Sequence, residues 1–444
     1  MDPQTEQQIE LAISPRWLIP VIPAGVVLHD HSVIIGAKRI QAILPTADLP
    51  ARYPGIAEVK LASHVLIPGL VNSHGHSPMS LFRGIADDVP LKTWLEDHIW
   101  PLESKLVSED FVYQGAELAI AEMLLSGTTC FADMYFFPDA VARAATNAHI
   151  RTQLSSPVLD FPTVWGQNAD EYIFKATDLH DDYRNSELIY TAFGPHAPYT
   201  VSDAPLQKIM TLAEELDIPI HMHLHETAEE VETAIQSTGK RPLQRLAELG
   251  LVSPRLVCVH GTQLSEQDIQ LIRDNGAHVV HCPESNLKLA SGFCPVGALI
   301  SAGVNVALGT DGCASNNDLD MFSEMRTAAL LAKGVAGDAS TLPAHQALQL
   351  ATINGARALG LEQLIGSIEA GKFADLTAVR LDSLNALPVY NPESHLVYNT
   401  QAAQVSHVWV GGRAVVNDRQ LTTLEYGAVQ ELALHWQKEI SGVL

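Results

Sequence analysis

The amino-acid sequence predicts an α/β protein: a parallel (β/α)8 barrel with a small β-sandwich built from both ends of the chain. Strand-like apolar runs alternate with helix-like stretches through the middle of the chain. Several of these runs end in a histidine or an acid, and β-branched runs with turn signals gather near both ends. Such alternation is typical of a parallel sheet, and (β/α)8 barrels carry their site residues where the strands end.

Residues 1–66 are predicted to form the first part of the sandwich. The β-branched runs 25–28 and 32–36, and the partly alternating run 39–44, are typical of short strands separated by turns. Residues 369–444 are predicted to form the second part, followed by a C-terminal helix. There, 375–379 has strand composition, and 405–416 contains a Gly-Gly pair typical of a hairpin turn.

Residues 67–368 are predicted to form the barrel. Helical stretches such as 109–126 and 227–236 separate the strand candidates. Eight strand candidates, the number that closes such a barrel, lie near 70–74, 128–133, 151–158, 189–195, 218–225, 256–260, 278–282 and 304–310.

The first and last of these strands end in groups that bind metal ions. His74 and His76 are two residues apart, so both side chains point to the same face of a strand. Asp311 follows Gly309-Thr310 at the end of the last strand. Taken singly, the histidines could be polar residues at the barrel mouth and Asp311 a turn residue. Imidazoles together with one carboxylate suit a zinc-like ion that keeps one position open for water, which predicts a metal-dependent hydrolase.

Three histidines share one face of the fifth strand: His221, His223 and His225. Their spacing does not say which one binds a metal ion. Glu226, just beyond the strand, is a candidate general acid and base. Its alternative interpretation is an acid that stabilises the N-terminus of the next helix.

Two further histidines end strands. His260 ends the sixth strand and is a candidate ligand, or a group that polarises the substrate or the attacking water. His196 ends the fourth strand and is a candidate substrate contact. The fourth strand has no lysine over 189–196, which favours one metal ion over two. We interpret His278, His281 and His407 as structural.

Composition narrows the function classes. The net charge of −24 disfavours nucleic acid as a partner. Five widely spaced cysteines predict no disulfide framework and fit a reducing compartment. The first ten residues are acidic and polar, unlike a secretory signal, and no apolar run is long enough to span a membrane. We expect a cytoplasmic homo-oligomer that acts on a small molecule and binds neither nucleic acid nor membrane.

Four motifs together resemble the amidohydrolase superfamily: PGLVNSHGH at 68–76, LFRG at 81–84, HLHE at 223–226 and LGTDG at 308–312. The branch that the chain resembles contains cytosine deaminase, guanine deaminase and the triazine hydrolases. Segments 68–103, 281–289 and 311–317 are most similar to deaminases of 5′-methylthioadenosine and S-adenosylhomocysteine. The resemblance covers nearly the whole chain, including both β-rich ends.

The resemblance implies one Zn²⁺ per chain, with Fe²⁺ or Mn²⁺ as alternatives. Its implied ligands are His74, His76, His223 and Asp311. It also implies that Glu226 shuttles protons, that His260 steadies the attacking hydroxide, and that Asp311 helps to form it.

Three further residues are candidate substrate contacts. The resemblance implies that Glu103 contacts the ribose and that His196 contacts the base. Trp94 is expected to pack on the thioether end of the substrate, since small ligands bury most of their surface against apolar walls. The alternative for Trp94 is core packing.

The function implied is an aminohydrolase that cleaves a C–N bond of a cyclic amidine. It would convert the adenine ring of 5′-methylthioadenosine, S-adenosylhomocysteine or adenosine to the inosine-type product and ammonia. Arginines that some members use to hold the homocysteine carboxylate have no match in 155–162, which favours methylthioadenosine. The alternatives are a guanine or pterin deaminase, a triazine hydrolase, or a non-catalytic assembly barrel. The last is disfavoured because all four implied ligands and the glutamate are present.

Overall fold

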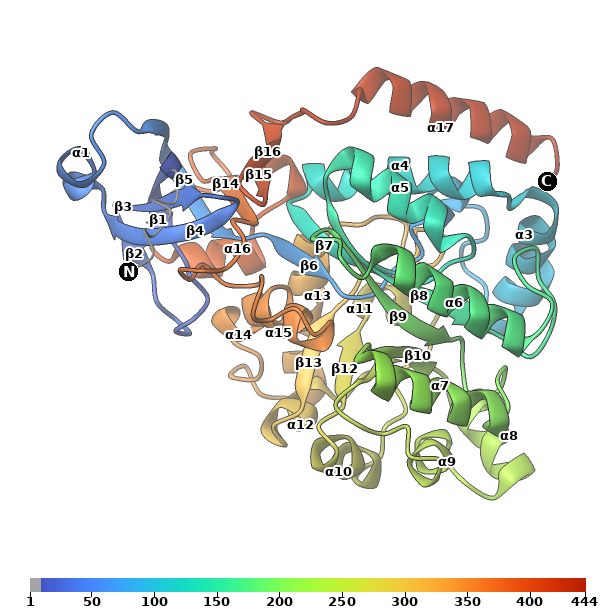
Figure 1. Cartoon of the computed structure of the whole chain (residues 1–444). Coiled ribbons are helices and arrows are strands. Elements are labelled where there is room, and N and C mark those ends of the chain that lie inside the picture. Colours follow the sequence, from blue (N-terminus) through green and yellow to red (C-terminus); the bar gives the residue numbers. More distant parts are fainter. Residues whose placement is uncertain (1–8) are drawn as a thin grey trace, which may run out of the picture.

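The computed structural model describes residues 9–444, and its centre is a parallel barrel surrounded by helices (Figure 1). All eight predicted strands are confirmed, and neighbours along the chain pair in parallel. The strands are β6 (Leu70–Asn72), β7 (Thr128–Asp133), β8 (Arg151–Val158), β9 (Ile189–Pro195), β10 (Ile220–Leu224), β11 (Leu256–His260), β12 (His278–His281) and β13 (Asn305–Leu308).

The first and last barrel strands meet through main-chain hydrogen bonds. The N–H of Ser73 donates to the carbonyl of Leu308 at 2.9 Å, and the N–H of Asp311 donates to the carbonyl of His74 at 3.0 Å. These bonds hold the ends of β6 and β13 side by side. Two candidate ligands that are far apart in the sequence therefore become neighbours.

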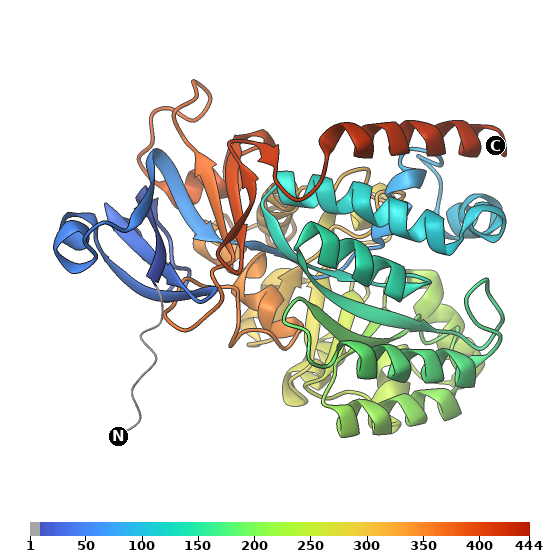
Figure 2. The same ribbon diagram turned by 45° about the horizontal axis from the view of Figure 1, so that its top comes forward.

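Helices cover the outside of the barrel (Figures 1 and 2). The helical stretches predicted at 109–126 and 227–236 are confirmed as α4 and α8, which begin after the capping residues Ser108 and Thr227. The helices that follow the barrel strands are α4 (Glu109–Leu125), α5 (Pro138–Ala148), α6 (Ala169–Tyr183), α7 (Asp203–Leu216), α8 (Ala228–Thr238), α9 (Pro242–Glu248), α10 (Glu266–Asp274), α11 (Pro283–Lys288), α12 (Val296–Ser301), α13 (Met321–Ala336), α14 (Ala344–Leu350) and α15 (Ile353–Ala358).

The segment between β6 and α4 contributes side chains to the cavity described below. It contains the 3₁₀ helix η2 (Ser77–Phe82), helix α2 (Leu91–Thr93), the π-helical turn η3 (Trp94–Ile99) and helix α3 (Trp100–Leu106). Single π-helical turns are rare and occur frequently at functional sites.

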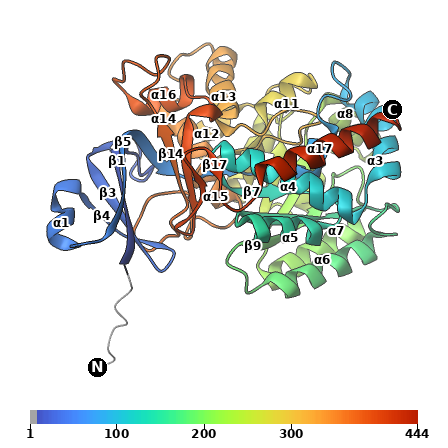
Figure 3. The ribbon, with the colours of Figure 1, turned by 90° about the horizontal axis from the view of Figure 1, so that it is seen from above.

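Both ends of the chain form one mixed sheet beside the barrel (Figures 2 and 3). Strand β5 joins them, because it pairs in parallel with β1 and antiparallel with β14. The strands are β1 (Ile9–Leu18), β2 (Leu28–His29), β3 (His31–Gly36), β4 (Arg39–Pro45), β5 (Ala57–Pro68), β14 (Leu376–Arg380), β15 (Val405–Val410), β16 (Arg413–Asn417) and β17 (Gln420–Leu421).

The two halves of this sheet share one apolar core, in which Ile13 and Leu66 lie in the same cluster as Leu376 and Trp409. This arrangement agrees with the predicted sandwich, and the hairpin around Gly411-Gly412 is confirmed. The domain boundaries at 66/67 and 368/369 stay predictions. Most of the polar segment 1–10, which argued against a secretory signal, lies outside the described residues.

One predicted strand is wrong. In the run 25–28, Gly25 lies in a turn, Val26 and Val27 are irregular, and only Leu28 enters β2. Gly25 has φ +71°, in the left-handed region that a turn uses and a strand does not. The β-branched composition of Val26 and Val27 did not outweigh this turn geometry.

The predicted C-terminal helix is α17 (Tyr426–Ser441), which lies along α4 (Figure 3). The indole N–H of Trp436 donates to the side-chain oxygen of Gln114 at 2.7 Å. The remaining short helices are η1 (Thr46–Asp48), α1 (Leu49–Arg52), α16 (Pro392–Tyr398) and η4 (Ala402–Gln404). None of the helices described over 9–444 is long and apolar enough to cross a membrane.

Candidate active site

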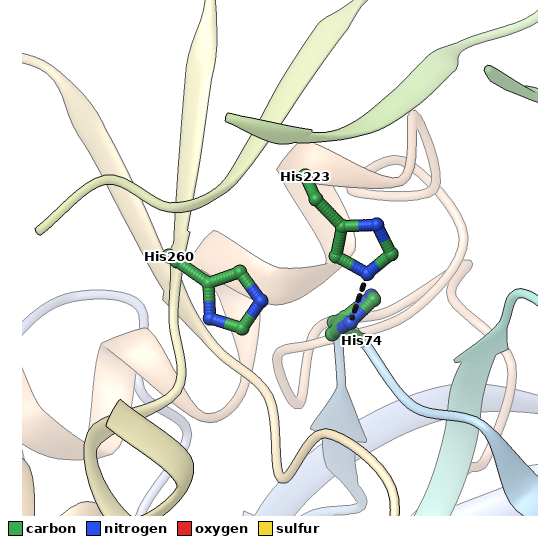
Figure 4. Close-up of side chains that lie close together, drawn as sticks. All are labelled: His74, His223 and His260. Atoms are coloured by element: carbon green, nitrogen blue, oxygen red, sulfur yellow. Dashed lines mark hydrogen bonds between the residues drawn. The ribbon is translucent and has the colours of Figure 1, made fainter. Parts of the chain in front are cut away.

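Three imidazole nitrogens and one carboxylate oxygen converge where the barrel strands end. Nε2 of His74 lies 3.3 Å from Nε2 of His223 (Figure 4). Oδ1 of Asp311 lies 3.4 Å from Nε2 of His74 and 3.3 Å from Nε2 of His76. Over residues 9–444 the structure forms two overlapping groups of possible metal-binding residues, one of His74, His76 and Asp311 and one of His74, His223 and His260. His74 belongs to both, so it links the four residues predicted as ligands.

The spacing of these atoms fits a zinc ion. Zinc binds histidine nitrogen and carboxylate oxygen at about 2.0–2.2 Å in a tetrahedral arrangement, which puts neighbouring ligand atoms about 3.3–3.5 Å apart. Three of the six separations among these four atoms are 3.3, 3.4 and 3.3 Å. The donor set of three nitrogens and one oxygen also matches the ligand chemistry of this ion.

The main chain orients two of the histidines. Nδ1–H of His76 donates to the carbonyl of Met134 at 2.6 Å, and Nδ1–H of His223 donates to the carbonyl of His196 at 2.9 Å. A carbonyl oxygen only accepts hydrogen bonds, so the proton of each ring stays on Nδ1. Each Nε2 therefore faces the cluster. Asp311 outweighs burial and raises the pKa of His76 to about 9, and a bound metal ion would replace the proton on that nitrogen.

Three hydrogen bonds hold the Asp311 carboxylate in place. Its Oδ2 accepts from the hydroxyls of Ser285 at 2.7 Å and Ser315 at 2.9 Å, and its Oδ1 accepts from the N–H of Gly312 at 2.9 Å. Burial raises the pKa of Asp311, but His74 and His76 outweigh burial and hold this pKa well below its usual value. Asp311 is therefore ionised, as a metal ligand must be.

Glu226 and His260 face each other beside the cluster. Nε2 of His260 lies 3.8 Å from Oε2 of Glu226, while Nδ1–H of His260 donates to Oδ1 of Asn286 at 2.9 Å. Burial raises the pKa of Glu226. A buried carboxyl group with a raised pKa can exchange a proton with a bound molecule near neutral pH.

Glu230 fixes the main chain at Glu226. Its carboxylate accepts from the N–H of His225 at 3.0 Å and from the N–H of Glu226 at 2.7 Å. Glu226 therefore does not cap the following helix with its side chain; Thr227 does so, by accepting from the N–H of Glu230. The alternative interpretation of Glu226 as a helix-stabilising acid has no hydrogen bond in its favour.

Three residues at strand ends have a left-handed backbone: His225 with φ 55°, His260 with φ 74° and Asp311 with φ 64°. This conformation is unfavourable for residues other than glycine and persists where the surroundings impose it. Each lies at or just beyond the end of a barrel strand. The sharp bend turns the chain at the points where the site is built.

The cluster lies at the base of a cavity of about 360 Å³. His76, His223, Glu226, His260 and Asp311 line its polar end. The rest of the wall is largely apolar and includes Leu95, Ile99, Trp100, Met134, Phe136, Leu159, Phe161 and Val164. Such a cavity suits a small molecule with one polar reacting end.

Two predicted substrate contacts lie on the cavity wall. The hydroxyl of Tyr135 donates to Oε1 of Glu103 at 2.6 Å, and burial raises the pKa of Glu103 to about 7. Nδ1 of His196 lies 3.1 Å from the hydroxyl of Thr200, and burial lowers the pKa of His196 to about 4. His196 is therefore neutral near pH 7.

Trp94 lies in the apolar core and also lines the cavity; its packing against a substrate stays a prediction. Only 6% of its surface is exposed. Its indole Nε1 has no hydrogen-bond partner among residues 9–444. The ring is therefore a core residue with one edge at the cavity.

The ambiguity among the three histidines of the fifth strand is reduced by the tertiary structure. Only His223 has a nitrogen in the cluster. His221 contacts His74 from beneath, and Nε2 of His225 accepts from the N–H of Leu243 at 3.1 Å. Residue spacing alone could not separate them, because all three share one face.

The residues interpreted as structural lie outside this arrangement. His278, His281 and His407 are not in either group of possible metal-binding residues found over 9–444. The five cysteines are free and buried. Burial raises the pKa of the Cys258 and Cys313 thiols to about 12, which fits packing rather than nucleophilic chemistry.

Sequence reasoning missed the residues that support the cluster. They are Ser285, Ser315, Asn286, Glu230 and Tyr135. Ser285, Asn286 and Ser315 lie inside the motifs 281–289 and 311–317, so the motifs themselves were a usable signal. Glu230 and Tyr135 had no signal beyond residue type.

The sequence and the structure together define the protein family of this chain. Residues 65–415 match the amidohydrolase family, and the chain belongs to that family. The chain is similar to the 5-methylthioadenosine/S-adenosylhomocysteine deaminase of Teredinibacter turnerae, with 52% identity over 97% of this chain and 98% of the relative. The corresponding protein of Saccharophagus degradans is also 52% identical, over 97% of both chains.

A solved structure is similar over nearly its whole length. It is an adenosine deaminase from Xanthomonas campestris with bound zinc, which has 49% identity and a TM-score of 0.96 and covers 98% of this chain and 99% of that one. The predicted family resemblance and fold are therefore confirmed.

Proposed function

We propose that this protein deaminates adenosine-type nucleosides by hydrolysis, with 5′-methylthioadenosine as its main substrate. S-Adenosylhomocysteine and adenosine are the other substrates to be compared. The observation that carries the proposal is the cluster of three imidazole nitrogens and one carboxylate at the base of a largely apolar cavity, beside the protonatable Glu226. The names of the two 52% identical relatives support the substrate.

We assign His74, His76, His223 and Asp311 as the ligands of one Zn²⁺ per chain. The spacing of their ligand atoms and the zinc bound in the Xanthomonas campestris structure support this choice over Fe²⁺ or Mn²⁺. Zinc bound there would act as a Lewis acid and lower the pKa of a water molecule towards neutrality.

Glu226 is proposed to move protons on the substrate. In its protonated form it gives a proton to N1 of the adenine ring, which makes C6 more electrophilic. It then takes the second proton of the attacking water, which restores its protonated form. Ammonia leaves, the C6–N bond is broken, and the ring retains the oxygen from water.

Asp311 and His260 are proposed to act on the water. Asp311, which its neighbours hold ionised, takes the first proton and later gives it to the exocyclic amine, which leaves as ammonia. His260 directs the water at C6, since Asn286 fixes its ring and leaves Nε2 facing Glu226. Both residues lie at the polar end of the cavity.

Glu103, His196 and Trp94 are proposed to hold the nucleoside. Glu103 accepts from the ribose hydroxyls, and neutral His196 contacts the base. Trp94 and the apolar wall pack against the thioether group. No lysine or arginine lines this cavity, which supports methylthioadenosine. Lys92 and Arg245 line an adjoining pocket that shares Trp100 and Glu226 with it, so S-adenosylhomocysteine is assayed beside methylthioadenosine.

The test is ammonia release by zinc-loaded protein from 5′-methylthioadenosine, S-adenosylhomocysteine, adenosine and guanine. We expect the highest kcat/KM with methylthioadenosine. If the protein binds zinc but releases no ammonia from any adenosine compound, the proposed substrate is wrong and the assignment as a metal-dependent hydrolase stands. In that case guanine, a pterin and a chlorinated triazine are the next substrates to assay.

We also propose that the protein acts in the cytoplasm, which the five free and buried cysteines support. A homo-oligomeric state stays a prediction, and light scattering on the purified protein tests it.

A further inference from the structure

Among the three histidines of the cluster, His74 differs in the partner of its second ring nitrogen. His76 and His223 donate to main-chain carbonyls. Nδ1 of His74 instead lies 2.9 Å from Nε2 of His221. A carbonyl oxygen can only accept, whereas an imidazole nitrogen can donate or accept. The tautomer of His74 therefore depends on the tautomer of His221.

The contact between these rings is closed to solvent. Both His74 and His221 are completely buried. Their planes are inclined by only 16° with ring centroids 5.1 Å apart, so the two nitrogens meet edge to edge. His221 lies on β10 two residues before His223. The same strand therefore supplies the candidate zinc ligand His223 and the residue that contacts His74.

We propose that His221 is a positioning residue that holds His74 in the tautomer able to bind zinc. This inference rests on the metal centre of the proposed function. Nε2 of His74 has a free lone pair only when the ring proton is on Nδ1. Nδ1–H then needs an acceptor in a place that water does not reach, and Nε2 of His221 is that acceptor.

The opposite pair of tautomers blocks the site. If Nε2–H of His221 donates to Nδ1 of His74, the His74 proton lies on Nε2 and points at His223 and Asp311. The two pairs of tautomers differ only in which nitrogen of each ring carries the hydrogen, so the net charge of His74 and His221 is the same in both. Burial of both rings leaves no other partner for Nδ1 of His74 in the part of the chain that the structure describes.

The binding arrangement has a cost at His221 itself. With Nε2 accepting, its own hydrogen is on Nδ1, and this nitrogen has no hydrogen-bond partner among residues 9–444. A buried unpaired polar group is unfavourable. The contact with His74 is the one hydrogen bond made by the side chain of His221 within those residues, which fits a role in orienting that ring.

Two substitutions separate this role from packing. In His221→Gln the amide oxygen can occupy the position of Nε2 and accept from His74. In His221→Asn the side chain is too short to reach it. His278→Asn is the matched control, because His278 is also a barrel-strand histidine but lies at the start of β12, where its Nδ1 contacts Asn305.

The measurement is zinc affinity of the full chain by competition with a chromophoric chelator, with folding checked by circular dichroism. We expect His221→Asn to bind zinc about 10–100-fold more weakly, as for other groups that orient metal-binding histidines. His221→Gln should stay within about threefold of the wild type, and His278→Asn should not change. Wild-type affinity in folded His221→Asn overturns the proposal.

A second measurement needs no variant. Nitrogen-15 NMR of the histidine rings in the zinc-loaded wild-type protein should show Nε2 of His221 without a proton and Nδ1 with one. The reverse pattern overturns the proposal even if His221→Asn does not fold. If the wild-type chain binds no zinc, the proposed metal centre is wrong as well. If the wild-type chain binds zinc and deaminates its substrate, and His221→Asn binds zinc equally tightly, only the role of His221 is wrong.

Discussion

The hydroxyl of Tyr135 donates a 2.6 Å hydrogen bond to Oε1 of Glu103 on the wall of the cavity. Tyr135 follows the end of β7, and Glu103 lies on α3 in the segment that contributes to the cavity wall. The bond therefore connects Tyr135, just beyond a barrel strand, with the segment between β6 and α4. It leaves Oε2 of Glu103 available for a ligand.

Removing this hydroxyl tests whether Glu103 is positioned by it. We expect Tyr135→Phe to lower kcat/KM for 5′-methylthioadenosine by about 2–13-fold, since a net hydrogen bond contributes about 0.5–1.5 kcal/mol. The loss should lie mainly in KM, and a compound without ribose hydroxyls should show no change. Steady-state kinetics with both compounds makes the comparison, and equal losses for the two would contradict the role.

Glu103 also predicts a pH dependence of stability. Burial raises its folded-state pKa to about 7, above the ordinary value of 4.5, so its contribution to stability is complete below about pH 4.5. That contribution is lost as pH rises towards 7. We expect the free energy of unfolding of the metal-free protein to fall less between pH 5 and 7.5 in Glu103→Gln than in the wild type, by on the order of 1–3 kcal/mol. Urea unfolding at several pH values measures this, and parallel pH profiles would refute it.

Glu226→Gln separates proton transfer from metal binding. The amide keeps the shape of the side chain but cannot move a proton. We expect zinc affinity within about threefold of the wild type and turnover lower by about 10²–10⁴-fold. Metal analysis and ammonia release on the same sample test both parts. Near-normal turnover removes Glu226 from the mechanism.

Asp311→Ala should lose both metal and activity, because it removes the oxygen that lies near both His74 and His76. Ser285→Ala is the control, since it removes one hydrogen bond to Oδ2 and leaves Oδ1 in place. We expect a smaller loss of zinc affinity in the control, about 10-fold. Full zinc content in Asp311→Ala would show that Asp311 is not a ligand.

A buried ion pair joins the barrel to the terminal sheet. Nε of Arg151 on β8 lies 2.9 Å from Oδ2 of Asp375, and both side chains are 1% exposed. Arg151→Met should lower the free energy of unfolding by about 3–5 kcal/mol, because it leaves a buried carboxylate without its partner. The double variant Arg151→Met/Asp375→Asn should recover part of this loss in urea unfolding. A single variant as stable as the wild type would contradict the prediction.

Much of the fold was predictable because local patterns agree with the tertiary structure. Several barrel strands, such as β11 and β13, are apolar runs, and α4 and α8 begin at capping residues that the sequence displays. The run 25–28 failed because a turn at Gly25 outweighed β-branched composition. The continuous pairing of β1, β5 and β14 was not predictable, since it joins strands from opposite ends of the chain.

By itself, the sequence determined which residue types end the barrel strands, and hence that a site of histidines and acids lies at one end of the barrel. Side chains two residues apart on a strand point to the same face, so the sequence could not distinguish His221, His223 and His225 as metal ligands. Only the tertiary structure decided that His223 enters the cluster while His221 lies under His74. The reason is that barrel closure, not local sequence, brings β6, β10 and β13 together and sets which nitrogen of each ring faces which partner.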